Sequence, residues 1–197
     1  MKKLFFLALF LIPLFLFSQE EKPKSNVLSV GSGFAFLGSG DRFIGKLAFD
    51  YNKRLSNYFE LELSLNFGHL NKIESKQISN LHVVENDIII TTYHLDNNIY
   101  VNPFKFNKGF NFSLGTGYSL MYVTELYGSR LVKGDPRSVF NINQKSYESR
   151  TSIGYNIIPR FSYQFKNNSV LTFKLMMQSY LNGDISSGAM LSFGKVF

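Results

Sequence analysis

Charged residues of both signs recur on one face of the alternating segments of this chain. Asp50 follows Lys46 by four residues and Glu62 follows Glu60 by two, and even spacings place side chains on the same face of a β-strand. The complete set is Lys46, Asp50, Glu60, Glu62, Asp96, Arg150, Arg160 and Lys174. It could line an ion path or form a buried network that fills and stiffens the interior of the fold. We expect the network, because buried charges must be paired and both signs are present.

The histidines are the other candidates for chemistry. The chain has three, His69, His82 and His94. His69 follows an alternating segment, and Ser179 and Ser187 could lie at its level, so an acyl-transfer site is conceivable. However, the local sequence FGHL has no His-x-Ser pairing like that of lipid A deacylases. No metal-ligand spacing or phosphate loop is present. We therefore expect neither enzyme activity nor a cofactor, and keep a lipid A-modifying deacylase or acyltransferase as the alternative.

These residues lie on segments in which large apolar side chains alternate with small or polar ones. Leu61, Leu63 and Leu65, for example, alternate with Glu62, Ser64 and Asn66. A period of two predicts strands. Eight are predicted, at about 27–37, 43–51, 59–67, 89–101, 110–122, 149–165, 169–179 and 188–197. Turn-forming sequences between them favour an antiparallel up-and-down arrangement.

Alternation alone permits either face of the barrel to point inward. An eight-stranded barrel is just wide enough inside for side chains, and the Phe, Tyr and Leu face would overfill it. The opposite face combines glycine and serine with long polar residues, which suits a narrow lumen. The sequence therefore predicts an all-β, antiparallel, transmembrane barrel of about eight strands, with its apolar face toward lipid.

The N-terminus has the pattern of a secretory signal peptide. Lys2 and Lys3 precede an uncharged run that ends at Phe17, which is too short for a transmembrane helix. We expect a signal peptide at 1–18, cleaved after Ser18 or alternatively after Gln19, a polar leader at 19–26 and the barrel domain at 27–197. The formal charge of +7 is spread out, which argues against nucleic-acid binding.

Two of the predicted connections are long, at about 71–86 and 124–147. They are the third and fifth of seven and would share one end of the barrel, opposite both termini. Short periplasmic turns and longer external loops are typical of outer-membrane barrels. We expect both loops to be extracellular, although Leu81–Ile90 could instead form an extra hairpin. Lipopolysaccharide phosphates could meet the basic residues of the second loop, which are Arg130, Lys133, Arg137 and Lys145.

The last ten residues, GAMLSFGKVF, alternate in the same way and end on a phenylalanine. This ending resembles the C-terminal signature of small bacterial outer-membrane β-barrels of the OmpA-barrel and OmpX type, including porin-like or PorT-like proteins. Lys195 departs from it, since that position is usually apolar. The resemblance implies that the membrane assembly machinery recognises Leu191, Phe193 and Phe197.

The resemblance also implies a place and a general role. We expect a monomer in the outer membrane with both termini in the periplasm and with lipids and lipopolysaccharide around it. The expected role is structural, or an interaction at the cell surface with an unidentified protein partner. A secretion or transport accessory is a further alternative.

Overall fold

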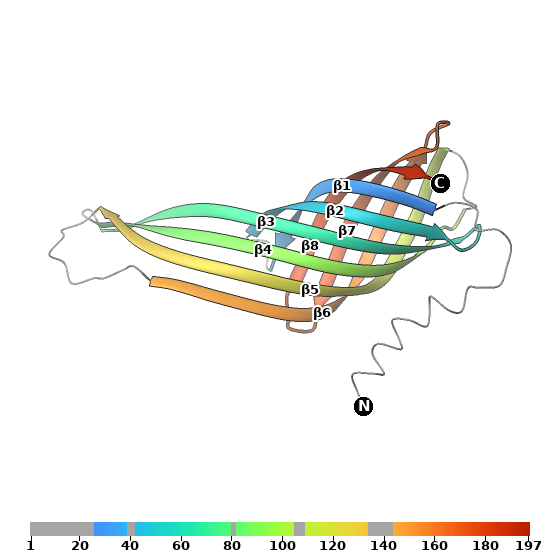
Figure 1. Cartoon of the computed structure of the whole chain (residues 1–197). Helices are drawn as coiled ribbons and strands as arrows, with labels where there is room; N and C mark the ends of the chain where they lie inside the picture. The colour runs from blue at the N-terminus through green and yellow to red at the C-terminus, as the bar shows by residue number, and fades with distance from the viewer. Residues whose placement is uncertain (1–25, 39–41, 80–81, 105–108, 134–143) are drawn as a thin grey trace, which may run out of the picture.

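The computed structural model describes residues 26–38, 42–79, 82–104, 109–133 and 144–197. The expected signal peptide and nearly all of the leader lie outside these residues. Within them, no helix is long and apolar enough to cross a membrane. The strands are β1 (Asn26–Leu37), β2 (Arg42–Arg54), β3 (Phe59–Ser79), β4 (His82–Val101), β5 (Gly109–Lys133), β6 (Gln144–Gln164), β7 (Ser169–Tyr180) and β8 (Ile185–Val196) (Figure 1).

These strands form one closed antiparallel barrel in sequence order, which confirms the predicted fold class and strand number. β8 closes the barrel against β1, with Val27 opposite Val196 and Leu37 opposite Ser186. Beyond the last strand, the amide of Asn26 donates to the carbonyl of Phe197 at 3.0 Å, and the amide of Phe197 donates back at 2.9 Å. Closure gives the backbone groups of both terminal strands a partner, which lipid could not provide.

Four strands continue well past the barrel as a curved sheet (Figure 1). We call it the protruding sheet; it consists of residues 70–79 of β3, 82–90 of β4, 123–133 of β5 and 144–152 of β6. The barrel end beside it is the sheet end, and the end that holds Asn26 and Phe197 is the terminal end. The β3–β4 ladder runs without a break from Phe59 opposite Val101 to Gln77 opposite Val83.

The predicted loops are therefore wrong in extent. Most of 71–86 belongs to β3 and β4, and 124–133 and 144–147 belong to β5 and β6, while 134–143 lies outside the described residues. Leu81–Ile90 forms no extra hairpin, because 82–90 is the start of β4. β8 likewise begins at Ile185, three residues before its predicted start. In the protruding sheet, backbone pairing continues where the apolar alternation has stopped.

The apolar face points outward, as predicted. Leu63 and Leu65 are 47% and 55% exposed. Glu62, which precedes Leu63, and Ser64, which lies between the two leucines, are buried. Pro159, which has no N–H to donate, lies where the β6–β7 ladder is interrupted between Ile157 and Arg160.

Glycines make room for two buried tyrosines inside the barrel. A Cβ on Gly115 would collide with the ring of Tyr100, and one on Gly154 would collide with the ring of Tyr180. The inward rings therefore depend on missing side chains in the opposing strands.

Candidate functional site

Two groups of aromatic side chains mark the limits of the outward apolar band. Near the sheet end, Phe36 and Phe43 have ring centroids 5.5 Å apart, and a second run joins Phe67, Tyr93 and Tyr122 at 5.4 and 6.3 Å. Toward the terminal end the group comprises Phe110, Phe112, Phe161 and Phe173. Aromatic girdles of this kind lie at the two interfaces of membrane barrels.

The distance between the girdles matches the apolar part of a membrane. Along β5, the girdle residues Phe112 and Tyr122 are ten positions apart. At ~3.3 Å per residue and a strand tilt of about 40°, this separation is roughly 25 Å along the barrel axis. An outer-membrane barrel has an apolar band about 25 Å tall. The first outward residues beyond this girdle are polar, namely Thr124 on β5 and its partner Thr91 on β4.

A buried network of opposite charges fills the lumen toward the terminal end. The Nζ atom of Lys174 lies 2.8 Å from Oδ2 of Asp50 and 2.7 Å from Oε2 of Glu62. Nη1 of Arg160 lies 2.6 Å from Oε1 of Glu60, and its guanidinium group stacks 3.8 Å from the ring centre of Tyr100. These five charged side chains are at most 8% exposed.

The middle of the lumen is polar, and its side chains are connected by hydrogen bonds. Asp96 accepts hydrogen bonds from Asn66 Nδ2 at 2.8 Å and from Gln178 Nε2 at 3.3 Å. His94 Nδ1 lies 2.8 Å from the hydroxyl of Tyr180. Lys46 is 3% exposed, but its Nζ atom has no hydrogen-bond partner among the described residues. Lys46 makes none of the ion pairs of the charged network toward the terminal end, although the sequence placed it on the same strand face as those residues.

Apolar side chains close the lumen between this polar layer and the sheet end. Ile90, Met121, Val123 and Tyr180 form a buried cluster, against which Leu37, Leu70 and Ile88 pack. A second buried cluster beside the charged network contains Ala48, Tyr100, Ile158, Met176 and Met190. Ion pairs toward the terminal end and apolar contacts toward the sheet end therefore fill the described part of the lumen.

We therefore expect the purified protein to form no stable large pore in planar lipid bilayers. Current recordings at up to about 100 mV should show only brief, irregular events, because a small barrel lumen is filled by its own side chains. Steady channels with the conductance of a porin would contradict this closed lumen.

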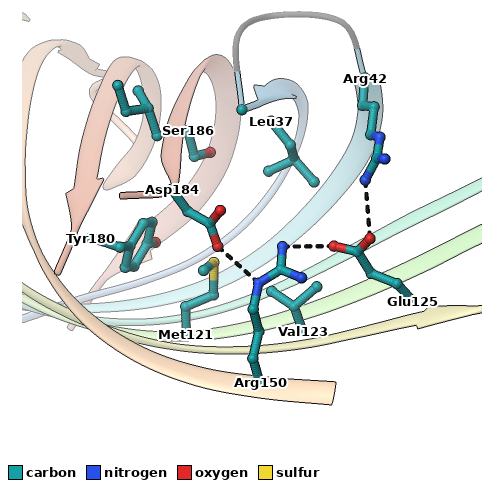
Figure 2. Close-up of a pocket in the computed structure, with 11 residues that line it drawn as sticks. Leu37, Arg42, Met121, Val123, Glu125, Arg150, Tyr180, Asp184 and Ser186 are labelled. Carbon is teal, nitrogen blue, oxygen red and sulfur yellow. Dashed lines mark hydrogen bonds and ion pairs between the residues drawn. The ribbon is translucent and has the colours of Figure 1, made fainter. Parts of the chain in front are cut away.

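Arg150 faces inward as predicted, but it lies at the sheet end and takes no part in the lumen network. It belongs to a group that we call the mouth cluster, comprising Arg42, Glu125, Arg150 and Asp184 (Figure 2). Nη2 of Arg150 lies 2.6 Å from Oε1 of Glu125, and its Nε lies 3.0 Å from Oδ2 of Asp184. Nη1 of Arg42 lies 3.0 Å from Oε2 of Glu125. The cluster ties β2 and the β7–β8 turn to the root of the protruding sheet.

Glu125 is the centre of this cluster and was missed in the sequence, where it fell in a predicted loop. It lies three residues beyond the girdle residue Tyr122, outside the apolar band. Burial alone would raise the pKa of its carboxyl group, but hydrogen bonds from Tyr127 and Arg150 and the nearby guanidinium charges lower that pKa below its usual range. Its contribution to stability is thus present above about pH 4.3 and is lost as the pH falls through the lower folded-state pKa.

The histidine singled out for acyl transfer has no serine at hand among the described residues. His69 is exposed, its Nδ1 lies 3.2 Å from Oγ1 of Thr91, and its ring stacks on Phe67. Ser179 and Ser187 are on β7 and β8, which are not neighbours of β3. His69 thus lies on a different part of the barrel wall from the two serines, which are close together on the paired strands β7 and β8.

The closed barrel, the apolar band between two girdles and the filled lumen define the fold of the small outer-membrane β-barrels. The sequence itself matches no family model and no curated protein. The fold of this chain is, however, similar to that of several solved structures. A major outer membrane protein from Thermus thermophilus superposes with a TM-score of 0.60 at 12% identity, over 88% of this chain and 98% of that one.

Two further structures share the fold. Ail, the attachment invasion locus protein of Yersinia pestis, has a TM-score of 0.56 at 14% identity, over 88% of this chain and 98% of Ail. Neisserial surface protein A has a TM-score of 0.55 at 15% identity, over 87% and 97% of the two chains. Ail has also been solved in complex with the heparin analogue sucrose octasulfate. At these identities the likeness concerns the fold.

Proposed function

We propose that this chain is a non-enzymatic outer-membrane protein that presents the protruding sheet outside the cell as an interaction surface. The observation that carries the proposal is that β3 to β6 continue past the girdle while the other four strands end there. On this proposal the terminal end faces the periplasm, and the closed barrel works as a monomer among outer-membrane lipids and lipopolysaccharide.

Both outer strands of the protruding sheet have an edge without a partner in the described part of the chain. The β2–β3 ladder ends with Gly45 opposite His69, so the rest of β3 pairs only with β4. The β6–β7 ladder begins at Gly154, so the start of β6 pairs only with β5. Unpaired strand edges are templates for the addition of an extended chain from a partner.

The side chains at these edges are accessible as well. Asn71 to Ser75 of β3 and Lys145 to Ser149 of β6 are exposed, including Ile73 at 58% and Tyr147 at 64%. Away from the mouth cluster, the side-chain pairs on this sheet include Lys72 with Glu74, 2.6 Å apart on the surface, and Ser129 with Asn86. The names of the similar structures, a surface protein and an attachment locus protein bound to a sulfated sugar, support a role in surface contact.

Site-specific photocrosslinking in intact cells tests this role. A photoreactive residue at Ser75 or Ser146, on the two edges, should give discrete adducts with another macromolecule of the cell surface. The same residue at Leu126, on a middle strand of the sheet, tests recognition by the sheet face. At the lipid-facing position Leu65 it serves as the control. Adducts that are the same from the edges as from Leu65, or none from the sheet, would contradict the proposal.

Phe197 carries the predicted assembly signal together with Leu191 and Phe193. All three side chains point outward, and Phe197 is 68% exposed. We expect deletion of Phe197 to lower outer-membrane levels several-fold, with degradation of the periplasmic protein, because the assembly machinery would read this residue. The deleted protein should still refold in detergent and keep its heat-modifiable gel mobility. Immunoblots of separated membranes measure the first effect, and normal outer-membrane levels would refute the assignment.

A further inference from the structure

A pocket opens at the sheet end, between the β1–β2 hairpin, the β7–β8 turn and the root of the protruding sheet (Figure 2). One wall is apolar and is built from Leu37, Met121, Val123 and Ile185. The other wall is the mouth cluster, and the Tyr180 side chain also lines the pocket. We call this the mouth pocket. Its combination of one apolar wall and one charged wall suits a ligand that is itself amphiphilic.

The charged wall offers more donors than acceptors, although Asp184 also lines the pocket and accepts hydrogen bonds from Arg150 and Asn182 through Oδ2. Both oxygens of Glu125 are occupied, one by Arg150 and the other by Arg42 and Tyr127. A guanidinium group has five N–H donors, and these contacts use only some of them on each arginine. The side chain of Glu125 is 5% exposed, against 40% for Arg42 and 38% for Arg150. An incoming group therefore meets two arginines that are more exposed than either carboxylate, since Asp184 is 30% exposed, although the formal charges of the cluster cancel.

Size restricts the ligand further. The pocket has a volume of about 200 Å³, below the ~300–1,000 Å³ of typical drug-sized sites. At ~30 Å³ per water molecule, this is the space of about seven waters. A carboxylate with a short alkyl chain fills such a space, and the planar guanidinium fork matches carboxylate geometry.

We propose that the mouth pocket binds a small amphiphilic carboxylate of the short-chain fatty acid class. The carboxylate accepts hydrogen bonds from Arg42 and Arg150, and the alkyl chain packs on Leu37, Met121 and Val123. This site lies at the root of the protruding sheet and does not include the edge residues Ser75 and Ser146, so its test is independent of the proposed surface interaction.

Methionine methyl groups provide the probe for this site. Met121 lines the pocket, whereas Met177 faces lipid and Met176 and Met190 lie in the other buried cluster. The full chain is labelled with ¹³C-methyl methionine, placed in lipid nanodiscs and titrated with hexanoate. We expect a saturating shift of the Met121 signal alone. 1-Hexanol, which has the same chain without the charge, should shift Met121 at least tenfold less at equal concentration.

Variants separate the contributions of the two walls. Arg42→Gln and Arg150→Gln should each weaken hexanoate binding at least tenfold. Val123→Phe should abolish it by filling the pocket while both arginines remain. Lys72→Gln removes a cation on the protruding sheet outside the pocket and should bind normally. Heat-modifiable gel mobility verifies that each variant is folded.

Three outcomes would overturn the proposal. If hexanol shifted the Met121 signal as much as hexanoate does, the pocket would be an apolar cavity without recognition of the carboxylate. If the Met177 signal shifted in parallel without saturating, hexanoate would be partitioning into the lipid. No Met121 shift would show that the pocket does not bind this class. Tighter binding of N-acetyl-Gly-Gly-Leu than of hexanoate would assign the site to a peptide C-terminus instead.

Discussion

Arg160→Met should destabilise the folded barrel by about 3–5 kcal/mol, the largest effect that we expect from a single lumen substitution. Arg160 is 4% exposed and is paired with Glu60, next to Glu62 and over the ring of Tyr100. Methionine is of similar length but removes the guanidinium group that pairs with Glu60, whereas Glu62 keeps Lys174 as a partner. The cost arises from the buried charges that remain, more than from the lost attraction.

Urea unfolding in lipid vesicles measures this effect, followed by tyrosine fluorescence or gel mobility because the chain has no tryptophan. Lys166→Met, in the exposed β6–β7 turn, should change the free energy of unfolding by less than about 0.5 kcal/mol. Adding Glu60→Gln to Arg160→Met should restore part of the loss, because the orphaned charge is removed. A loss below about 1 kcal/mol for Arg160→Met, roughly that of a surface pair, would show that the network is hydrated rather than closed.

Leu63→Arg should cost about 2–4 kcal/mol, because it puts a charge on the lipid face near the middle of the membrane. Leu63 lies midway along β3 between Phe59 and the girdle residue Phe67, and its side chain points outward. Leu63→Ala should cost less, because it only shortens an apolar side chain.

Ile73→Arg is the matched control, since it makes a similar change on the same face of the same strand but beyond the girdle. Ile73 is 58% exposed, so arginine there should alter stability by less than about 0.5 kcal/mol. Refolding and unfolding in vesicles give both values. Equal tolerance of arginine at the two positions would mean that the apolar band is not where the girdles place it.

The sequence pattern predicted the barrel wall well because lipid contact requires a strict alternation. Outward residues in the band are mostly apolar, with Asn97 opposite Leu63 as an exception, so the outward position of Leu63 also fixes Glu62 and Ser64 as inward. The same alternation placed Lys174 and Asp50 on the inward face, and the two side chains do meet in the lumen. An odd or even position in a strand determines which side of the barrel wall a residue faces, but not its height along the barrel axis.

Height is the reason why Arg150 was grouped wrongly. Its inward parity is correct, but strand tilt and stagger place it at the mouth, where its partners are Glu125 and Asp184. Glu125 itself lay in a stretch without apolar alternation. Both faces of the protruding sheet lie outside the apolar band, so backbone pairing maintains these strands with little demand on side-chain type. The inward tyrosines left a fainter signal, which was the glycines opposite Tyr100 and Tyr180.

The placement of the protruding sheet outside the cell is the central claim, and surface labelling of single cysteines tests it most directly. The natural chain has no cysteine, so every introduced thiol reports alone. Ser75→Cys lies on the protruding sheet and Lys166→Cys lies at the terminal end. With a membrane-impermeant maleimide on intact cells, we predict that Ser75→Cys is labelled and that Lys166→Cys is labelled only after the outer membrane is permeabilised. Labelling of Lys166→Cys but not Ser75→Cys on intact cells would contradict the proposed orientation and the function built on it.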